Sequence, residues 1–447
     1  MESQRSGSFK ELKVRNWRQF RSAEIKLHPR LTVITGANGS GKSTLLNIFS
    51  QHFGWNRTYL STPIHEKKSG YLKYLIGRFG RRNLNPNDNS VVVGSLSYAN
   101  GAESNLYVIE DPRQPQYHLH LQNPKEVHGL FIASHRPLPV YQQVLNIPTN
   151  VIDPQKAYSH YHSETLKRWT GTHSQFSPTY RLKESLISMA TFGAGNQYVK
   201  GNRVVLDAFL GFSEILKKVL PKSLGFIRIS IRTPEVVLVT ESGDFLLDAS
   251  SGGIMALIDL AWQIHIFSMS LLAEPGDKEF VVTIDEPENH LHPSMQRSLM
   301  ANLLDAFPQV QFIIATHSPF MVSSVKDSRV YVLDYMNIES EGGEENLTDD
   351  EISWRNSRAR RVVSQELDNI NRAGTASEIL REVLGVPATV PAWVEDEVKR
   401  ITDEHRDLPF SAETLHSLRV SLANIGCAEF YADSLSKLIE KAERPND

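Results

Sequence analysis

The chain has 447 residues and a mass of 50.5 kDa, which is enough for a large folded core with at least one further module and excludes a disulfide-stabilised mini-protein. Hydrophobic residues make up 40% and charged residues 22% of the sequence, as in ordinary globular proteins, so global disorder and a fibrous repeat are excluded. The 48 basic and 51 acidic side chains leave a net charge of -3, so binding to nucleic acid or to an anionic membrane would need a local basic patch. The single cysteine, Cys427, cannot form an internal disulfide, and the first residues lack an apolar signal core, so we expect a cytoplasmic protein.

The first third of the chain reads as strands arranged around a glycine-rich turn. Apolar and β-branched runs predict strands at 9–15, 23–27 and 31–35. The third run ends in glycines that precede a predicted helix at 43–53. Alternating apolar and polar residues between about 88 and 123 predict an antiparallel region, with a tight hairpin at Asn100-Gly101.

The middle of the chain combines a helical insertion with strands of a parallel core. Residues from about 136 to 220 read mainly as helices and loops, which predicts a helical or lid insertion. Strand signals follow at 226–231, 235–240, 245–247, 280–284, 311–315 and 329–333. The apolar run 253–273 is long enough to span a membrane, but Asp259, Gln263 and His265 near its middle make insertion costly, so we expect a buried helix and no membrane contact.

The acidic, glycine-bearing stretch 338–351 marks the end of the first domain. We therefore expect a first domain, the head, at 1–335, an acidic linker at 336–356 and a helical C-terminal domain at 357–447. A capping box is predicted from Thr375 to Glu378. Apolar residues recur at helical spacing near the end of the chain, where they either pack within the domain or form a partner-binding face: Leu415, Leu418, Leu422 and Ile425.

A phosphate-binding motif is present at residues 36–43. Their sequence, GANGSGKS, fits the pattern G-x-x-x-x-G-K-[ST] and stands between a predicted strand and a predicted helix, as the pattern requires. The glycines let backbone N–H groups and the helix N-terminus face the phosphates, Lys42 reaches the β- and γ-phosphates, and Ser43 can bind Mg²⁺. The alternative is an incidental glycine-rich turn.

Three further segments carry residues suited to this chemistry. The strand 281–284 runs into Asp285 and Glu286, which suit Mg²⁺ binding and the polarisation of an attacking water, although alone they could be two solvated acids. The turn Ser250-Ser251-Gly252-Gly253 offers N–H groups and a hydroxyl to an anion, or serves only as a helix N-cap. His317 ends a predicted strand, where its imidazole either contacts a γ-phosphate or is structural.

The order and chemistry of these segments resemble those of the ATP-binding-cassette (ABC) ATPases. The Walker A motif of that class is matched by GANGSGKST, the signature turn by SSGG, the Walker B motif and D-loop by VVTIDEPENHLHP, and the switch histidine by IIATHSP. The opening FKELKVRNWRQFRSAEIKLHPRLTVITG and the DEPENHLHP wording resemble the chromosome-maintenance (SMC), RecF, Rad50 and overcoming-lysogenization-defect (OLD) group. The resemblance covers about residues 8–335. It implies an α/β P-loop NTPase fold, an ABC-ATPase head with an antiparallel β subdomain and a helical insertion, followed by an α-helical tail.

The resemblance also implies a nucleotide site shared between two copies. ATP and Mg²⁺ are the expected cofactors, and two heads are expected to close so that Lys42 and Asp285 of one copy meet Ser251 and Gly253 of the other. Arg18, in the Asn16-Trp17-Arg18 segment, either contacts nucleotide or is a surface arginine of a strand. The expected nucleotide-binding residues are Gly36, Asn38, Gly39, Gly41, Lys42, Ser43, Thr44, Ser251, Gly252, Gly253 and Arg18.

Catalytic roles follow from the same resemblance. Glu286 would be the catalytic carboxylate and His317 the sensor of the γ-phosphate. Ser43 and Asp285 would hold Mg²⁺, and the segment Asn289–His292 would link the two nucleotide sites of the dimer.

The chain departs from the family pattern in places. Ile254 stands where many signature turns carry glutamine, and the Q-loop glutamine has no clear counterpart, Gln142 or Gln143 being a guess. The middle segment is too short and too rich in turns for a long coiled coil, and one cysteine rules out a zinc hook. We therefore expect a compact head.

Basic and aromatic side chains alternate between Arg57 and Arg82. They are Arg57, Lys67, Lys68, Lys73, Arg78, Arg81 and Arg82, with Tyr59, Tyr71, Tyr74 and Phe79 interleaved. Such a segment could contact a nucleic-acid backbone and stack bases. The alternative is a set of solvated lysines and core aromatics.

The sequence shows no second active site. The tail lacks the histidine pattern of an HNH nuclease, and no Toprim pattern follows Asp334, so the chain does not resemble the fused OLD nucleases. It resembles the stand-alone ATPases of bacterial anti-phage systems, which implies an ATP-hydrolysing sensor and scaffold, at least dimeric, that acts with a separate nuclease or toxin. Two alternatives remain open: a RecF- or Rad50-like repair ATPase that binds DNA directly, and a nucleotide-locked scaffold with negligible turnover.

Overall fold

The chain forms two compact units. The computed structural model describes residues 7–65, 71–76, 90–136, 140–271, 279–337, 360–368, 374–384, 392–406 and 408–443. Contacts between residues divide the chain into a head, residues 1–379, and a tail, residues 380–447.

An 11-stranded mixed sheet organises the head. In order across the sheet its strands are β10 (Leu119–Leu121), β8 (Glu103–Ile109), β7 (Ser90–Tyr98), β1 (Phe9–Trp17), β2 (Phe20–Lys26), β18 (Arg360–Glu366), β17 (Arg329–Asn337), β3 (Leu31–Gly36), β16 (Val310–Ala315), β15 (Phe280–Asp285) and β11 (Gly129–Ile132). The last five run parallel to one another, and the pairs from β10 to β2 are antiparallel. Every residue of β3 and β16 is buried, as parallel strands covered on both faces require.

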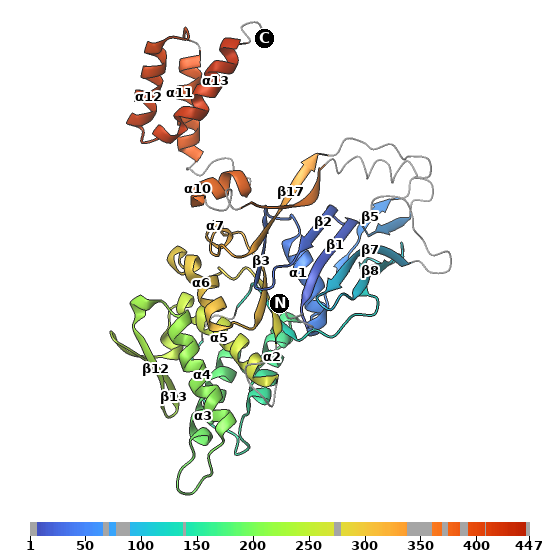
Figure 1. Cartoon of the computed structure of the whole chain (residues 1–447), viewed down its shortest axis with the longest axis vertical. Helices are drawn as coiled ribbons and strands as arrows, with labels where there is room; N and C mark the ends of the chain where they lie inside the picture. The colour runs from blue at the N-terminus through green and yellow to red at the C-terminus, as the bar shows by residue number, and fades with distance from the viewer. Residues whose placement is uncertain are drawn as a thin grey trace. The chain divides into compact units, whose positions relative to one another are not determined.

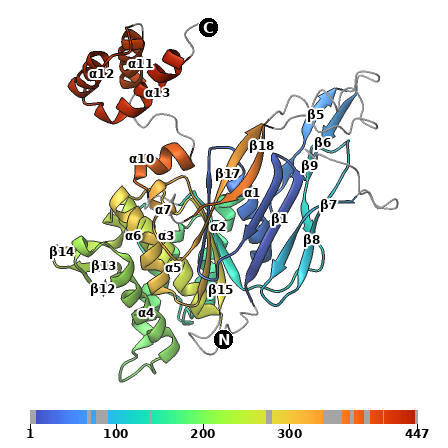
Figure 2. The ribbon, with the colours of Figure 1, turned by 45° about the horizontal axis from the view of Figure 1, so that its top comes forward.

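Helices surround the parallel part of the sheet. Those of the head are α1 (Lys42–Ser50), α2 (Pro154–Trp169), α3 (Pro178–Gly193), α4 (Arg203–Val219), α5 (Gly252–Ser270), α6 (Pro293–Ala306), α7 (Pro319–Val322) and α10 (Ala376–Glu378). Helix α1 packs on β3, β15 and β16, which places the phosphate motif over the strands that carry the other site residues. Figures 1 and 2 both show α3 to α6 gathered on one side of the head and the antiparallel strands β1, β2, β7 and β8 on the other. The α/β class predicted from the sequence is confirmed.

Smaller elements complete the head. A three-stranded sheet of β12 (Phe226–Arg232), β13 (Glu235–Thr240) and β14 (Gly243–Leu246) packs against α3 and α4, and the predicted helical insertion contains α2, α3 and α4. Two short pairs lie near the antiparallel strands: β4 (Tyr59–Leu60) with β9 (Gln116–Tyr117), and β5 (Thr62–His65) with β6 (Leu72–Leu75). Each of α2, α3, α4 and α5 begins at a side-chain N-cap, namely Asp153, Ser177, Asn202 and Ser251.

Helix α5 is long and apolar enough to cross a membrane, yet it is a core helix of the head. In its most apolar window 72% of the residues are buried inside the protein. Its polar side chains have partners there: Asp259 accepts hydrogen bonds from the Tyr161 hydroxyl and from Gln263, and the His265 ring lies 2.7 Å from the Ala208 carbonyl oxygen. A buried helix is what the interrupting polar residues predicted.

The head extends beyond the boundary placed at 335. Strand β18 pairs antiparallel with β17 and also lies beside β2, where Val362 is fully buried opposite Phe20. The segment 360–366 therefore contributes to the head sheet and not to the tail, because its strand pairs with partners far away in the sequence. The predicted acidic linker lies mostly outside the described residues. The predicted capping box is present, since Thr375 and Glu378 exchange both of its hydrogen bonds.

The tail is a small helical unit. It contains α11 (Ala392–Arg406), α12 (Ala412–Asn424) and α13 (Tyr431–Glu443), which contact one another. Its core is formed by Ile401, Leu418, Leu422 and Leu438, with Leu415 and Ile425 packed against it. The regular apolar spacing seen in the sequence is thus used for packing inside the tail.

Candidate functional site

The phosphate motif forms a tight loop between β3 and α1 that only glycines permit. Gly36, Gly39 and Gly41 have φ angles of 140°, 79° and 103°. At Gly41 a Cβ atom would lie 2.2 Å from Nε2 of Gln19 and 2.4 Å from the ring of Phe20. Ala37, Asn38 and Gly39 are exposed at the tip of the loop, so its backbone is open to a ligand.

Lys42 lies inside this loop. Its Nζ donates to the carbonyl oxygens of Gly36 and Ala37 at 2.9 and 3.0 Å, and the side chain is buried. Burial lowers the pKa of Lys42 to about 8, while the carboxylates of Glu286, Asp285 and Glu288 act in the opposite direction. A partly desolvated ammonium group within a glycine loop fits a polyphosphate, whose charge would favour its protonated form.

Ser43 and Asp285 meet at the edge where α1 begins and β15 ends. The Ser43 hydroxyl donates to Oδ1 of Asp285 at 3.1 Å. The pKa of Asp285 is raised to about 6, mainly by burial and also by the charges of Glu286 and Glu288, while the Ser43 hydrogen bond and the charge of Lys42 oppose the shift. A divalent cation at these oxygens would offset the repulsion between the carboxylates, and hydroxyl and carboxylate oxygens are the ligands that Mg²⁺ prefers. The residues therefore fit the cofactor that the motif implies.

Glu286 points its carboxylate at two polar neighbours. Its Oε1 lies 3.5 Å from Nε2 of His317, and its Oε2 accepts a hydrogen bond of 2.8 Å from Asn289. About a third of each of the Glu286 and His317 side chains is exposed, so water can reach both. The backbone of Glu286 has a φ of 49°, which is unusual for a residue other than glycine and is found where a structure is held for function.

The electrostatic surroundings of His317 favour its neutral form. Burial lowers the pKa of His317, and the positive charge of Lys42 lowers it further, whereas Glu286 raises it. The structure therefore brings together Lys42 and Ser43 of α1, Asp285 and Glu286 at the end of β15, and His317 just after β16.

Glu288 is a site residue to which the sequence assigned no role. Its Oε1 accepts hydrogen bonds from the Thr316 hydroxyl at 2.6 Å and from the backbone N–H groups of His317 at 2.8 Å and Ser318 at 3.2 Å. Burial raises the pKa of Glu288, and these bonds oppose the shift. Glu288 thereby connects residues 316–318, which include His317, to the loop that follows β15. The sequence signals this role only by a further acidic residue, which stands two positions after Glu286.

The signature turn caps α5. Ser251 is the N-cap and its hydroxyl accepts from the Ile254 N–H at 3.4 Å. Ser251 and Gly252 are exposed, and a Cβ atom at Gly252 would meet nothing within 4 Å. Gly253 lies against the loop after β15, where a Cβ atom would be 3.1 Å from the His290 carbonyl oxygen. The turn thus presents an open helix N-terminus on the surface of the head.

Arg18 lies among aromatic rings. It has a φ of 54°, its guanidinium lies 5.2 Å from the centre of the Tyr59 ring, and it donates to the Tyr117 hydroxyl at 3.3 Å. The next two residues of the chain, Gln19 and Phe20, approach the phosphate loop at Gly41. The contacts of Arg18 thus place it with the antiparallel strands.

Gln142, the glutamine considered for the Q-loop, makes contacts in the helical insertion. Its amide N–H donates to the Gln175 carbonyl at 3.1 Å, and its amide oxygen accepts from the Ser177 N–H at 3.2 Å. These bonds hold the residues before α3. They place the Gln142 amide in the helical insertion and give no support to a role of Gln142 as the Q-loop glutamine.

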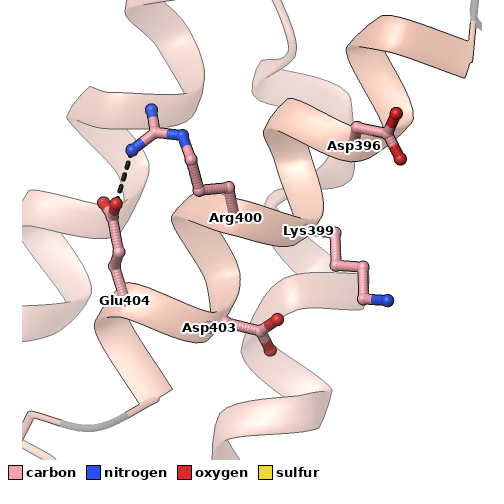
Figure 3. Close-up of a pocket in the computed structure, with 5 residues that line it drawn as sticks. All are labelled: Asp396, Lys399, Arg400, Asp403 and Glu404. Atoms are coloured by element: carbon pink, nitrogen blue, oxygen red, sulfur yellow. Dashed lines mark hydrogen bonds and ion pairs between the residues drawn. The ribbon is translucent and has the colours of Figure 1, made fainter.

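The tail carries a shallow hollow of different character. Figure 3 shows its lining on α11, formed by Asp396, Lys399, Arg400, Asp403 and Glu404. Arg400 pairs with Glu404 and with Glu397 along the same helix. Acidic and basic side chains that pair in this way form a solvated helix face, so the hollow offers no distinct ligand chemistry.

Two family models match parts of the chain. Residues 11–88 match a family described as "AAA domain", and residues 265–323 match one described as "AAA domain, putative AbiEii toxin, Type IV TA system". The first match contains the phosphate loop, and the second contains β15, Glu286 and His317.

Heads of SMC proteins are among the solved structures that the chain resembles. An SMC head domain from Thermotoga maritima has a TM-score of 0.38 and 14% sequence identity, with 75% of this chain and 100% of that one covered. An Smc head domain from Pyrococcus furiosus, bound to the C-terminal domain of ScpA, has a TM-score of 0.40 and 15% identity, with 80% and 96% covered.

Curated relatives come from retron and Septu systems. The Retron Vc95 probable ATPase of Vibrio cholerae serotype O1 biovar El Tor is 32% identical over 117 residues, which are 25% of this chain and 22% of the relative. The Retron Ec83 probable ATPase of Escherichia coli is 29% identical over 177 residues, 38% and 29% of the two chains, and the Septu protein PtuA of Bacillus thuringiensis is 24% identical over 200 residues, 42% and 45%. The chain thus spans less than half the length of these relatives. They confirm the resemblance predicted from the motifs: the chain is similar to probable ATPases of retrons and to Septu proteins PtuA, and parts of it match AAA-domain models.

Proposed function

We propose that the chain binds ATP with Mg²⁺ between two copies of its head, hydrolyses it, and thereby controls a separate effector protein in anti-phage defence. The observation that carries the proposal is the network around Glu286, in which a buried lysine, a serine–aspartate pair and a histidine converge at the edge of one sheet. The similarity to retron and Septu ATPases supports the defence setting.

Different residues of one head bind the phosphates, hold Mg²⁺ and accept the proton of the attacking water. Lys42 and the N–H groups of the phosphate loop bind the phosphates, and Ser43 and Asp285 would hold Mg²⁺, which supplies positive charge against the phosphate oxygens. Glu286 accepts a proton from the attacking water, because its carboxylate is partly open to solvent at the edge of the phosphate site. Asn289 and His317 fix the direction of that carboxylate.

A second copy supplies what one head does not offer. The exposed N-terminus of α5, with Ser251 and Gly252, presents backbone N–H groups and the positive end of the helix dipole, both of which favour a phosphate. Two copies related by a two-fold axis place the same surfaces against each other twice, so a dimer contains two composite sites.

The effector part of the proposal is tested by co-purification from the native gene cluster. A tagged chain carrying Glu286→Gln is expressed together with its neighbouring genes, because a nucleotide-bound state that is not hydrolysed should retain a partner longest. We expect one neighbouring gene product to co-purify in a fixed ratio, and to be lost from the matched Lys42→Met variant, which cannot hold nucleotide. Recovery of the ATPase alone in both variants would contradict a dedicated effector.

A hollow beside the antiparallel strands favours a second candidate, an ATPase that binds DNA directly. The hollow has a volume of about 660 Å³ and is lined by Arg57 and Lys125 together with His118, Tyr107 and His120. The Tyr107 and His120 rings stack, with centres 5.2 Å apart and planes 25° apart. Cations beside stacked rings suit a single strand, which offers phosphates and unpaired bases. Of the predicted basic segment, Arg57 and Lys73 are described and exposed, whereas Lys67, Lys68, Arg78, Arg81 and Arg82 lie outside the described residues.

The double variant Arg57→Glu, Lys125→Glu tests this candidate. We expect it to weaken binding of a short single-stranded oligonucleotide and to reduce the slope of log affinity against log salt by roughly 1.4, since two phosphate contacts are lost. Fluorescence anisotropy over a range of salt concentrations measures both quantities. Lys200→Glu, Lys222→Glu is the matched control, because these exposed lysines lie on the helical insertion side of the head. Equal affinity of the two variants would remove the DNA assignment.

A further inference from the structure

Arg136 is a buried charged side chain that lies against the loop 286–289, called the catalytic loop below. It follows β11, the strand next to β15 that carries Asp285, and its side chain is 8% exposed. A guanidinium group that is almost removed from water normally has a carboxylate or several carbonyl oxygens as partners. Its partners therefore show what its burial serves.

The guanidinium of Arg136 binds the backbone of the catalytic loop. Its NH2 group donates to the Glu286 carbonyl oxygen at 3.1 Å, and its NH1 group donates to those of Pro287 at 3.2 Å and Asn289 at 3.1 Å. The planar guanidinium group presents several donors in a fixed geometry, which suits three carbonyl oxygens spread along one loop. Arg136 thus fixes the loop at both ends of the turn that begins with Glu286.

The same loop also fixes the side chain of Glu286. The amide of Asn289 donates to the Ser134 carbonyl oxygen at 3.2 Å as well as to the Glu286 carboxylate at 2.8 Å. Residues 134–136 therefore hold both the main chain and, through Asn289, the carboxylate of Glu286. The left-handed backbone of Glu286 needs such support, because a residue with a side chain does not favour it.

Electrostatics connect Arg136 to the signature helix. Burial lowers the pKa of Arg136, and the negative charge of Asp259 is the largest opposing influence, followed by Glu288. Asp259 lies on α5, seven residues after Gly252, and is itself held by the Tyr161 hydroxyl and Gln263. The helix whose N-terminus would face the nucleotide of a second copy therefore stabilises the charge that holds the catalytic loop.

We propose that Arg136 is a positioning residue for ATP hydrolysis, which holds Glu286 in its working geometry through the backbone of residues 286–289. This inference rests on the proposed function. It predicts that Arg136 acts on turnover and not on the affinity for ATP, because its hydrogen bonds within the described part of the chain go to the loop 286–289 that follows β15.

Arg136→Lys tests the proposal, because lysine keeps the charge but cannot bind three carbonyl oxygens in one plane. We expect kcat to fall on the order of 10²-fold, the effect of a small misplacement of a catalytic group. KM and the affinity for a fluorescent ATP analogue, measured by titration, should stay within about twofold. Asn289→Ala removes the other link between residues 134–136 and Glu286, so it should lower kcat in the same selective way, and it provides the test if Arg136→Lys does not fold.

Arg181→Lys is the matched control. Arg181 is a mostly buried arginine in the helical insertion that pairs with Glu164 and Glu184. Its replacement should lower the melting temperature without a selective fall in kcat. Unchanged kcat in Arg136→Lys, or a loss of ATP affinity that accounts for the whole defect, would overturn the positioning role while leaving the ATPase proposal intact. A wild-type chain that binds ATP without turnover would overturn both.

Discussion

Glu286→Gln is expected to lower ATP turnover by about 10²- to 10⁴-fold, the usual contribution of a general base, while ATP binding is retained. The amide has the shape of the carboxylate and can still contact Asn289 and His317, but it cannot accept the proton of the attacking water. Loss of the negative charge also removes one source of repulsion beside Asp285, so affinity for ATP with Mg²⁺ should be unchanged or higher. The variant should therefore accumulate as an ATP-bound dimer.

Phosphate release and light scattering measure the two halves of this expectation. Lys42→Met is the contrasting variant, since without the buried ammonium group the chain should neither bind ATP nor dimerise with it. Normal phosphate release by Glu286→Gln would show that Glu286 is not the base. A wild-type chain that dimerises with ATP but releases no phosphate would instead favour the nucleotide-locked scaffold.

The residues nearest the phosphates could be predicted from the sequence because local rules determine their positions. A glycine loop between a strand and a helix has few possible backbone shapes, and Gly36, Gly39 and Gly41 take the positive φ angles that the motif needs. Parallel strands end at one edge of a sheet, so Asp285, Glu286 and His317 could be expected to meet there.

The residues that support this site could not be predicted, because their partners are distant in the sequence. Arg136 binds carbonyl oxygens about 150 positions later, and any loop carbonyl could have been its acceptor. Strand β18 has only a short apolar run of its own, and it belongs to the head because it pairs with β17 on one side and with β2 on the other. Pairings of this kind depend on the complete topology, which spacing alone does not determine.

A composite site makes a further prediction: two variants that are each inactive should restore each other. Gly252→Asp is suited to this test, because a side chain there meets nothing within 4 Å and an acid in the first turn of α5 favours the isolated helix. In a dimer, however, its negative charge would face the nucleotide of the other copy, so turnover should fall on the order of 10²-fold. Lys42→Met disables the opposite half of the same site.

An equal mixture of Lys42→Met and Gly252→Asp chains is expected to recover about a quarter of the wild-type turnover. Random pairing makes half of the dimers mixed, and each mixed dimer has one site with both residues intact and one site with both altered. The control is an equal mixture of wild-type chains with chains that carry both substitutions. In this mixture the mixed dimers have no intact site, so turnover at constant total protein should also be about a quarter of wild type. Independent monomers would instead give a half. Phosphate release measured after exchange of subunits decides between these outcomes. If the two single variants fail to restore each other while the control gives a half, each copy works alone and the signature turn has another purpose.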